Sequence, residues 1–381
     1  MNRYNVLDYG AKSNIDQLQT ETFQNAIDDC HRNGGGRVVV PEGNYLISSI
    51  RLYSNITFHL LENAVLIGST NCEDYINFKV PSTLRYLYDD YYVKAWNLPE
   101  YYAYGIICAF NENNITIKGE KGSKIDGMEC YDPNGEEKFR GPMGIVFSQC
   151  QNIHMEGYTF INCANWSHQI DNCENVHANN VSILAGHDGF NLHHCTNIEI
   201  NNCTLKTGDD CFAGYDIENL IVKKCYMNTA CNVFRIGGYN LVFDDCIIEG
   251  PGKYPHIKEN TYETHRLFKY YSIRPDVIRK NGEKIIIKNS KIKNIPAVIE
   301  YIYGEERLMQ NNKPLRELIF DNVKIEGIRK KSIMKGNGEN CQILFKDCDI
   351  TLANELDENN FIEFDEYVKI IFDNTEIKSI S

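Results

Sequence analysis

Three aspartates have a residue type and a spacing that could form a catalytic site. Asp188 and Asp210 are 22 residues apart, and Asp209 directly precedes Asp210. If the chain coils with a period of 22 residues, the three carboxyl groups lie on adjacent coils. Like charges held this close cannot all ionise freely, so at least one of these carboxyl groups should have a raised pKa.

A protonated carboxyl group close to an ionised one is what glycoside hydrolysis by paired carboxylates requires. One acid protonates the leaving oxygen, while a carboxylate on the other side activates a water molecule. A calcium site, or an acidic ladder on a solvated face, would have the same spacing. The spacing by itself leaves these interpretations open.

A period close to 22 residues is visible in a repeated pattern of Asn, an aliphatic residue, any residue, and an aliphatic or aromatic residue. From Asn152 onward the copies are spaced by 21 to 23 residues. Leucine-rich repeats share this period, but they need a leucine-dense signature and a helical segment. Here the copies hold short apolar runs separated by Asn and Gly. We therefore predict an all-β fold, a single-stranded parallel β-helix with about 22 residues per coil. The copies begin at Asn55, Asn114, Asn152, Asn175, Asn197, Asn219 and Asn240.

Residues at equal offsets from these asparagines should stack along the solenoid at the ~4.8 Å spacing of neighbouring strands. One such column holds Cys150, Cys173 and Cys195, and another holds Cys203, Cys225 and Cys246. We interpret both columns as ladders of small apolar side chains, with metal binding as the alternative. The Asn column we interpret as stacked amides that bond one another and the turn backbone.

Residues Thr20 to Asn33 form the only good helix pattern in the sequence. Apolar Phe23, Ala26 and Ile27 have helical spacing, and the glycines from Gly34 onward end the helix. Because a solenoid needs terminal caps, we expect this helix to cap the N-terminal end.

Segments near 72–104, 128–143 and 251–281 do not follow the coil pattern. Insertions of this length in a compact solenoid usually close a cleft or carry function, so we expect them to form groove walls. Less regular coils continue the repeat at Lys284 to Asn294, Leu318 to Gly327, Gln342 to Leu352 and Val368 to Ile377. We therefore predict one β-helix domain over residues 1–381.

The charge balance excludes several classes of partner. The chain has 39 Lys and Arg against 52 Asp and Glu, a net charge of −13 at pH 7, so we expect neither nucleic acid nor a membrane as a partner. An anionic substrate would need a locally basic groove.

The cysteine count and the N-terminus favour a reducing, cytoplasmic location. The number of cysteines, 15, is odd, and the N-terminus has no apolar signal segment. No motif for cofactor or metal chemistry is recognisable, so neither is predicted. The oligomeric state is left open.

Two motifs in consecutive coils resemble a known family. Gly186–Asn191 reads GHDGFN, and Thr207–Gly214 reads TGDDCFAG. They resemble the polygalacturonase family of glycoside hydrolases, family 28, in which an Asn-Thr-Asp-Gly motif is followed one coil later by Gly-Asp-Asp. Asn5–Lys12, Gly34–Gly43 and Asn55–Gly68 resemble the N-terminal cap and first coils of the same family. The resemblance implies a right-handed parallel β-helix.

The resemblance also implies a single-displacement mechanism that inverts the anomeric centre. Carried over by position, Asp209 would be the general acid, while Asp188 and Asp210 would activate the attacking water. Two positions depart from the family pattern. His187 stands beside the first Asp where the family has Thr, and Asn232 replaces the catalytic-site His of the following coil. His187 either compensates for that replacement or is a surface residue of the turn.

The Arg-Ile-Lys motif with which the family binds the substrate carboxylate is not found in this sequence. Arg235, Arg266 and Lys269 are the cations that could bind a carboxylate instead, although each could equally be a solvated charge. Sugar rings pack on flat aromatic rings, and Trp166 and Tyr215 are the aromatic residues whose positions favour this role.

These observations predict an inverting, exo-acting glycoside hydrolase of pectin-derived galacturonide or rhamnogalacturonide oligosaccharides. Its predicted substrate-binding residues are His187, Asn232, Arg235, Trp166, Tyr215 and Lys269. One alternative is a β-helix polysaccharide lyase, which pairs calcium with an Arg or Lys base, but no Arg or Lys occupies the acidic column. The other alternative is a non-catalytic polysaccharide-binding scaffold, because fold does not imply function.

Overall fold

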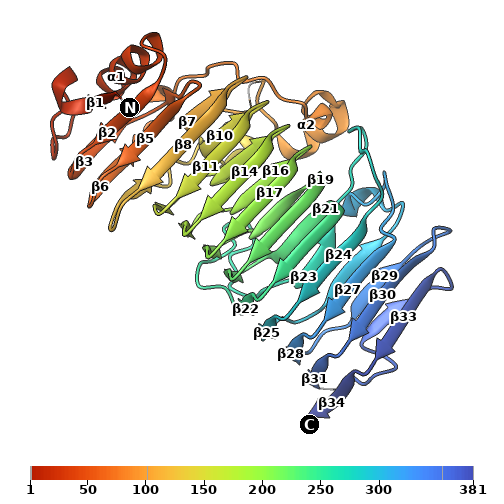
Figure 1. The fold of residues 1–381 in the computed structure, drawn as a ribbon. Helices are drawn as coiled ribbons and strands as arrows, with labels where there is room; N and C mark the ends of the chain where they lie inside the picture. Colours follow the sequence, from red (N-terminus) through yellow and green to blue (C-terminus); the bar gives the residue numbers. More distant parts are fainter. Residues whose placement is uncertain (1, 101, 354, 381) are drawn as a thin grey trace. The chain divides into compact units, whose positions relative to one another are not determined.

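The structure is a computed structural model that describes residues 2–100, 102–353 and 355–380. It divides into two compact units, Met1–Asn191 and Leu192–Ser381, with strand β16 (Phe190–His193) at the division. The chain folds as an all-β, right-handed parallel β-helix, which confirms the predicted fold class (Figure 1). The assignment of residues 1–381 to one domain stays a prediction.

The first unit is built from three parallel ladders in which each strand pairs with the equivalent strand of the next coil. The first ladder contains β1 (Arg3–Asn5), β2 (Gly36–Val40), β5 (Ile56–Leu60), β8 (Asn113–Gly119), β11 (Gln151–Glu156) and β14 (Glu174–Asn179). The second contains β4 (Ile50–Arg51), β7 (Gly105–Phe110), β10 (Met143–Ser148) and β13 (His168–Asp171). The third contains β3 (Gly43–Ile47), β6 (Ala64–Gly68), β9 (Lys124–Asp126), β12 (Thr159–Ile161) and β15 (Ser182–Leu184).

The second unit repeats the three-ladder plan. The first ladder contains β17 (Thr196–Asn201), β19 (Phe212–Lys223), β21 (Asn232–Asp244), β24 (Glu283–Lys288), β27 (Glu317–Asp321), β30 (Cys341–Lys346) and β33 (Val368–Asp373). The second branches from β21 through β23 (Arg266–Tyr270), β26 (Ile299–Ile302), β29 (Ser332–Lys335) and β32 (Ile362–Phe364). The third contains β18 (Thr204–Thr207), β20 (Tyr226–Thr229), β22 (Ile247–Glu249), β25 (Lys291–Lys293), β28 (Lys324–Ile328), β31 (Asp349–Ala353) and β34 (Glu376–Ile380).

The Asn column forms the corner of each coil, as the repeat predicts. Every anchor Asn has a positive φ, for example 62° at Asn55 and 59° at Asn219, a left-handed conformation that Asn tolerates better than most residues. The amides bond from coil to coil within each unit: Asn114 donates to Asn55 at 3.0 Å, and Asn219 donates to Asn197 at 3.0 Å. The corner is therefore held by backbone conformation and by an amide ladder together.

The cysteine columns lie inside the coils. All 15 cysteines are free thiols, and every one except Cys72 is buried. Cys203 and Cys225 stack on adjacent coils, with the Cys203 N–H 3.4 Å from the Cys225 sulfur. The six cysteines of the two columns are all buried, as expected for ladders of small apolar side chains.

Helix α1 (Thr20–Arg32) confirms the predicted helix, and it contacts β1, β2, β4 and β5 at the N-terminal end. Phe23, Ala26 and Ile27 form its fully buried face. The expectation that this would be the only good helix is wrong, because α2 (Asp90–Trp96) lies in the first insertion. Asp89 caps α2 by accepting the N–H of Tyr91 at 3.0 Å, and ring contacts rather than apolar spacing stabilise it.

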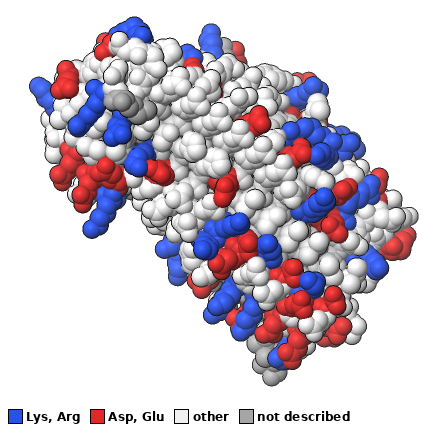
Figure 2. Space-filling model, in the orientation of Figure 1, with Lys and Arg blue, Asp and Glu red and all other residues white. Residues whose placement is uncertain are grey.

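The short 3₁₀ helices lie at the N-terminus and mainly in the connections between coils. They are η1 (Val6–Tyr9), η2 (Cys72–Asp74), η3 (Arg85–Tyr88), η4 (Glu136–Lys138) and η5 (Glu306–Leu308). Among the described residues, no helix is long and apolar enough to cross a membrane. On the face drawn in Figure 2, basic and acidic side chains are interspersed, so this face carries no continuous surface of one charge.

Candidate active site

The acid pair Asp209 and Asp210 lies in the turn between β18 and β19, within the second unit. The side chains of Thr207 and Thr229 both donate to the main-chain carbonyl of Asp209, the former at 2.7 Å. The N–H of Asp210 donates to Asp209 Oδ1 at 3.0 Å. Asp209 is 8% exposed and Asp210 is 1% exposed, so the turn holds two carboxyl groups away from bulk water.

Asn232, the residue one coil further along, binds Asp210 directly. Its main-chain N–H and its side-chain amide both donate to Asp210 Oδ1, at 3.1 and 2.8 Å. Burial and the charge of Asp209 raise the pKa of Asp210, while Arg235 and Asn232 oppose this rise. This confirms the expectation that at least one carboxyl in the column has a raised pKa.

Asp188 lies in the first unit, in the turn that follows β15. It is 5% exposed, and the side-chain amide of Asn191 donates to its Oδ2 at 2.7 Å. Asp188 and the acid pair belong to different units. That Asp188 joins Asp209 and Asp210 in one site stays a prediction.

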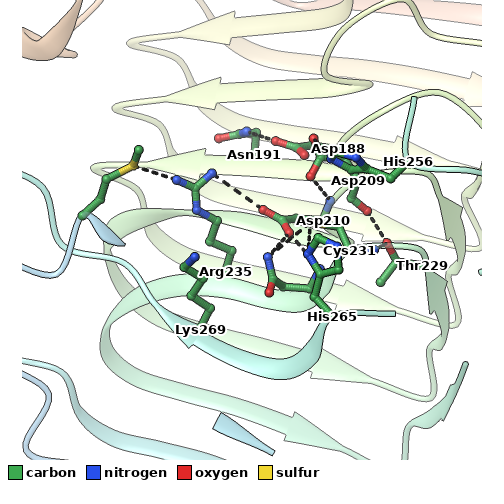
Figure 3. A network of polar contacts seen from close by, with 12 residues as sticks. Asp188, Asn191, Asp209, Asp210, Thr229, Cys231, Arg235, His256, His265 and Lys269 are labelled. Carbon is green, nitrogen blue, oxygen red and sulfur yellow. Dashed lines mark hydrogen bonds and ion pairs between the residues drawn. The ribbon is translucent and has the colours of Figure 1, made fainter. Parts of the chain in front are cut away.

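A group of cations lies beside Asp210 on the ladder formed by β21, β23 and β26. The register places Arg235, Lys269 and Glu300 side by side on successive strands, and Asn232 is paired with Arg266. Arg235 Nη1 is 4.0 Å from Asp210 Oδ2 (Figure 3). Lys269 Nζ is 2.9 Å from Glu300 Oε1, and Arg266 also pairs with Glu300. Two cations, Arg266 and Lys269, therefore share Glu300, and Arg235 faces Asp210.

Burial, and then the charge of Arg235, lower the pKa of Lys269, although Glu300 raises it. At Glu300, burial raises the pKa, but Lys269 and Arg266 outweigh this effect and lower it. Arg235 is further held by its surroundings: its guanidinium lies 4.4 Å from the ring centroid of Tyr271, and Nη2 lies 2.8 Å from Met309 Sδ.

In the first unit, insertions cover the residues that flank Asp188. His187 is 2% exposed and lies against the rings of Phe139 and Tyr131, at centroid distances of 5.4 and 6.0 Å. Trp166 is 8% exposed and makes an edge contact with Tyr102 at 5.2 Å. His187 is therefore packed against the second insertion rather than being an open surface residue. The roles of His187 and Trp166 in substrate binding stay predictions.

The prediction that Tyr215 contacts a sugar ring is wrong. Tyr215 is fully buried, and its hydroxyl donates to Asp276 Oδ2 at 2.6 Å. A ring with no exposed face cannot stack on a pyranose. Tyr215 instead fastens the third insertion to the coil, which the coil offset alone could not reveal.

Sequence reasoning missed His256, which comes from the same insertion and lies at the acid pair. His256 Nε2 is 3.6 Å from Asp209 Oδ2 (Figure 3). The ligand atoms of Asp209, Cys231 and His256 lie within 4.8 Å of one another, a set that could hold a metal ion. Burial, and then the charges of Asp210 and Asp209, raise the pKa of the Cys231 thiol well above its usual range. No coil offset points to His256, because the insertion lies outside the repeat.

The model of the family "Glycosyl hydrolases family 28" matches residues 36–249, more than half of the chain. The chain belongs to glycosyl hydrolases family 28. This family 28 chain is 30% identical over 131 residues to an exo-poly-alpha-D-galacturonosidase of Dickeya chrysanthemi, which covers 34% of this chain. It is 27% identical over 188 residues to a probable polygalacturonase of Vitis vinifera, which covers 47% of this chain. The matches span 19% and 36% of the length of these two relatives.

Solved structures of other proteins share the fold of this family 28 chain. An exopolygalacturonase from Thermotoga maritima superposes with a TM-score of 0.71 at 19% identity, covering 99% of this chain and 92% of its own. A polygalacturonase from Erwinia carotovora superposes with a TM-score of 0.66 at 17% identity, covering 94% and 95%. At these identities the likeness concerns the fold.

Proposed function

We propose that this family 28 chain is an inverting, exo-acting glycoside hydrolase of galacturonide oligosaccharides derived from pectin. The observation that carries the proposal is a buried pair of carboxyl groups, Asp209 and Asp210, next to a cluster of cations on the same face of the coils. The mutual repulsion of the two buried carboxyl groups favours a state in which one is protonated and the other is ionised, and the cations supply a place for an acidic sugar.

In the proposed mechanism Asp209 protonates the glycosidic oxygen, and Asp210 and Asp188 take the proton from the attacking water. The 22-residue spacing of Asp188 and Asp210 supports their assignment to one column. The N–H groups of Asn232 stabilise the ionised form of Asp210, which a base needs, against the effects of burial and of Asp209. Because the water attacks the anomeric carbon on the face opposite the leaving oxygen, this single displacement inverts the anomeric centre.

The cation cluster supports an acidic rather than a neutral sugar. Arg235, Arg266 and Lys269 carry three positive charges, and Glu300 balances one of them. An Arg side chain binds a carboxylate in a bidentate geometry, and a buried carboxylate without such a partner would be costly. The cluster therefore binds the substrate carboxylate in place of the absent Arg-Ile-Lys motif. A galacturonide is accordingly favoured over a neutral galactoside as the substrate.

Exo action is supported by the insertions near 72–104 and 128–143. Their aromatic residues Tyr102, Tyr131 and Phe139 pack against Trp166 and His187, as expected for walls that shorten a groove. Two of the similar proteins named above are exo-enzymes. Short oligosaccharides as substrates would agree with the cytoplasmic location that the sequence favours, and both remain proposals.

Product analysis on a panel of oligosaccharides tests the proposal. The panel holds homogalacturonan fragments, rhamnogalacturonan fragments and neutral galactosides, and the assay follows reducing ends, unsaturated uronate and the anomer first formed. We expect monosaccharide release from galacturonides without unsaturation, and inversion at the anomeric carbon.

Asp209→Asn should lower kcat at least about 10³-fold, since it removes the general acid. Asp245→Asn, which changes an exposed turn carboxylate, is the matched control and should retain wild-type activity. Unsaturated product would instead mean a lyase. Binding without turnover, unchanged by Asp209→Asn, would mean a scaffold.

A further inference from the structure

The segment 251–264 brings a second functional group to the acid pair from outside the coil repeat. Its two arms meet at an antiparallel bridge between His256 and Thr261, where the His256 N–H donates to the Thr261 carbonyl at 2.8 Å. The side chain of Thr264 donates to the Thr229 carbonyl at 2.6 Å. Thr229 also bonds the carbonyl of Asp209, so the hairpin is docked on the residue that fixes the acid turn.

The backbone of the hairpin determines which nitrogen of His256 carries the proton. The N–H of Glu259 donates to His256 Nδ1 at 3.1 Å, so Nδ1 is an acceptor. In a neutral imidazole the other nitrogen, Nε2, is then the donor. Nε2 faces Asp209 Oδ2 at 3.6 Å, and the imidazole is 8% exposed. His256 therefore directs its Nε2–H toward the Asp209 carboxylate, while the N–H of Glu259 holds the other side of the ring.

We propose that His256 is a positioning residue for the general acid: its Nε2–H holds Asp209 Oδ2 and orients the carboxyl group toward the leaving oxygen. The inference rests on the proposed role of Asp209. In the substrate complex the contact closes to hydrogen-bond length, as catalytic contacts commonly tighten on binding. When Asp209 gives up its proton, the same N–H stabilises the carboxylate that forms.

The titratable groups around His256 favour its protonated form, whereas the hairpin backbone opposes protonation. They are Asp209 and Asp210 on the acid turn, Glu259 on the hairpin, His265 at a ring distance of 5.8 Å, and the protonated thiol of Cys231. Burial lowers the pKa of His256, while Asp209, Glu259 and Asp210 raise it above its usual value. A second proton would have to sit on Nδ1, where it would face the N–H of Glu259. The hairpin therefore favours the neutral ring.

The same tautomer argues against His256 as a metal ligand beside Asp209 and Cys231. A metal on Nε2 requires the proton to move to Nδ1, and metal-bound histidines usually donate that proton to a carboxylate or carbonyl. Here Nδ1 meets a donor instead. The geometry therefore favours a hydrogen bond from His256 Nε2–H to Asp209 over a metal ion bound between them.

Two substitutions of His256 separate the proposed role from simple packing. His256→Ala removes the donor and should lower kcat roughly 10- to 100-fold, with KM changed less than about two-fold. Loss of the donor destabilises the Asp209 carboxylate, so the basic limb of the kcat profile should move to higher pH. His256→Gln keeps an N–H near the position of Nε2 and should restore most of kcat and the wild-type limb.

His265→Gln is the matched control, because this imidazole directly follows the same segment but faces Cys231 at 3.4 Å and Glu259 at 3.0 Å. It should leave kcat within about two-fold of wild type. Wild-type kcat and pH profile in His256→Ala, or no rescue by Gln, would overturn the proposal. So would activity that EDTA abolishes and Zn²⁺ restores, which would assign His256 to a metal.

Asp209→Asn is assayed in the same series, so the two proposals fail in different ways. If Asp209→Asn stays active, the proposed function loses its acid. If Asp209→Asn is inactive while His256→Ala behaves as wild type, the acid stands and only the role of His256 is wrong.

Discussion

At the residue scale, the site depends on how each carboxyl group is solvated by the protein. Asp210 is nearly inaccessible to water and adjoins Asp209, which favours its neutral form. Asn232 counters this with two N–H groups on one oxygen. An amide at this position thus limits the rise in the pKa of Asp210, as the proposed role of Asp210 as a base requires.

Asn232→Ala should reveal this balance in a pH profile. The substitution removes the side-chain donor at 2.8 Å, so the pKa of Asp210 rises further. Because a base must be ionised, the acidic limb of kcat/KM should move to higher pH, and kcat should fall about tenfold at acidic pH. Recovery of wild-type rates at alkaline pH is the expected companion result. An unmoved acidic limb would show that Asp210 is not the group that titrates there.

At the element scale, the third insertion is fastened to the coil by a buried polar network. His194 Nδ1 is 2.9 Å from Asp216 Oδ2, and Nε2 is 3.6 Å from Asp276 Oδ1. Arg279 Nε is 2.9 Å from Asp216 Oδ2, and the hydroxyl of Tyr215 donates to Asp276. Burial lowers the pKa of His194, but its bonds to Asp216 and Asp276 outweigh burial and raise it to about 9.

This network predicts a loss of stability in alkaline solution. A folded-state pKa near 9, above an unfolded value of about 6.5, contributes stability that is complete below pH 6.5 and lost as pH rises through 9. The loss should be on the order of 3 kcal/mol in the free energy of unfolding. Urea denaturation at several pH values measures it, with His194→Gln as the reference. The difference between the two proteins should shrink from pH 6.5 to 9.5, and a constant difference would contradict the linkage.

At the scale of the whole molecule, each coil depends chiefly on its neighbours, as in other solenoids. Near the C-terminal end, Phe345 on β30 stacks between Phe320 on β27 and Phe372 on β33, at centroid distances of 4.9 and 5.5 Å. All three lie on one ladder of the second unit. Their contribution is local to these coils.

Phe345→Ala should therefore destabilise the C-terminal coils without changing the chemistry. The cavity should cost about 3–5 kcal/mol and produce an early unfolding step, while kcat at 25 °C stays close to wild type. Circular dichroism, limited proteolysis and activity, followed together on heating, provide the measurement. Phe345→Leu should show a smaller effect. Simultaneous loss of activity and of all structure in one transition would mean that the solenoid is cooperative throughout.

Much of the fold was predictable because the period of a β-helix coil appears as a repeat in the sequence. Neighbouring coils must stack in register, so residues such as Asn219 and Cys225 recur with the period of the coil. The acid turn at Asp209 follows the same period, and so does its partner Asn232. Helix α2 was not predicted, since ring contacts and a cap stabilise it rather than an apolar stripe.

The sequence by itself determined the coil, the family motifs and the place of the acid turn, because these obey local periodicity. Only the tertiary structure decided which side chains surround them. It placed His256 at Asp209, set Glu300 between Lys269 and Arg266, and buried Tyr215 against Asp276. Each of these contacts joins segments that are not in a fixed sequence relation. Their positions depend on how insertions dock on the coils, which is a matter of packing and hydrogen bonding rather than of period.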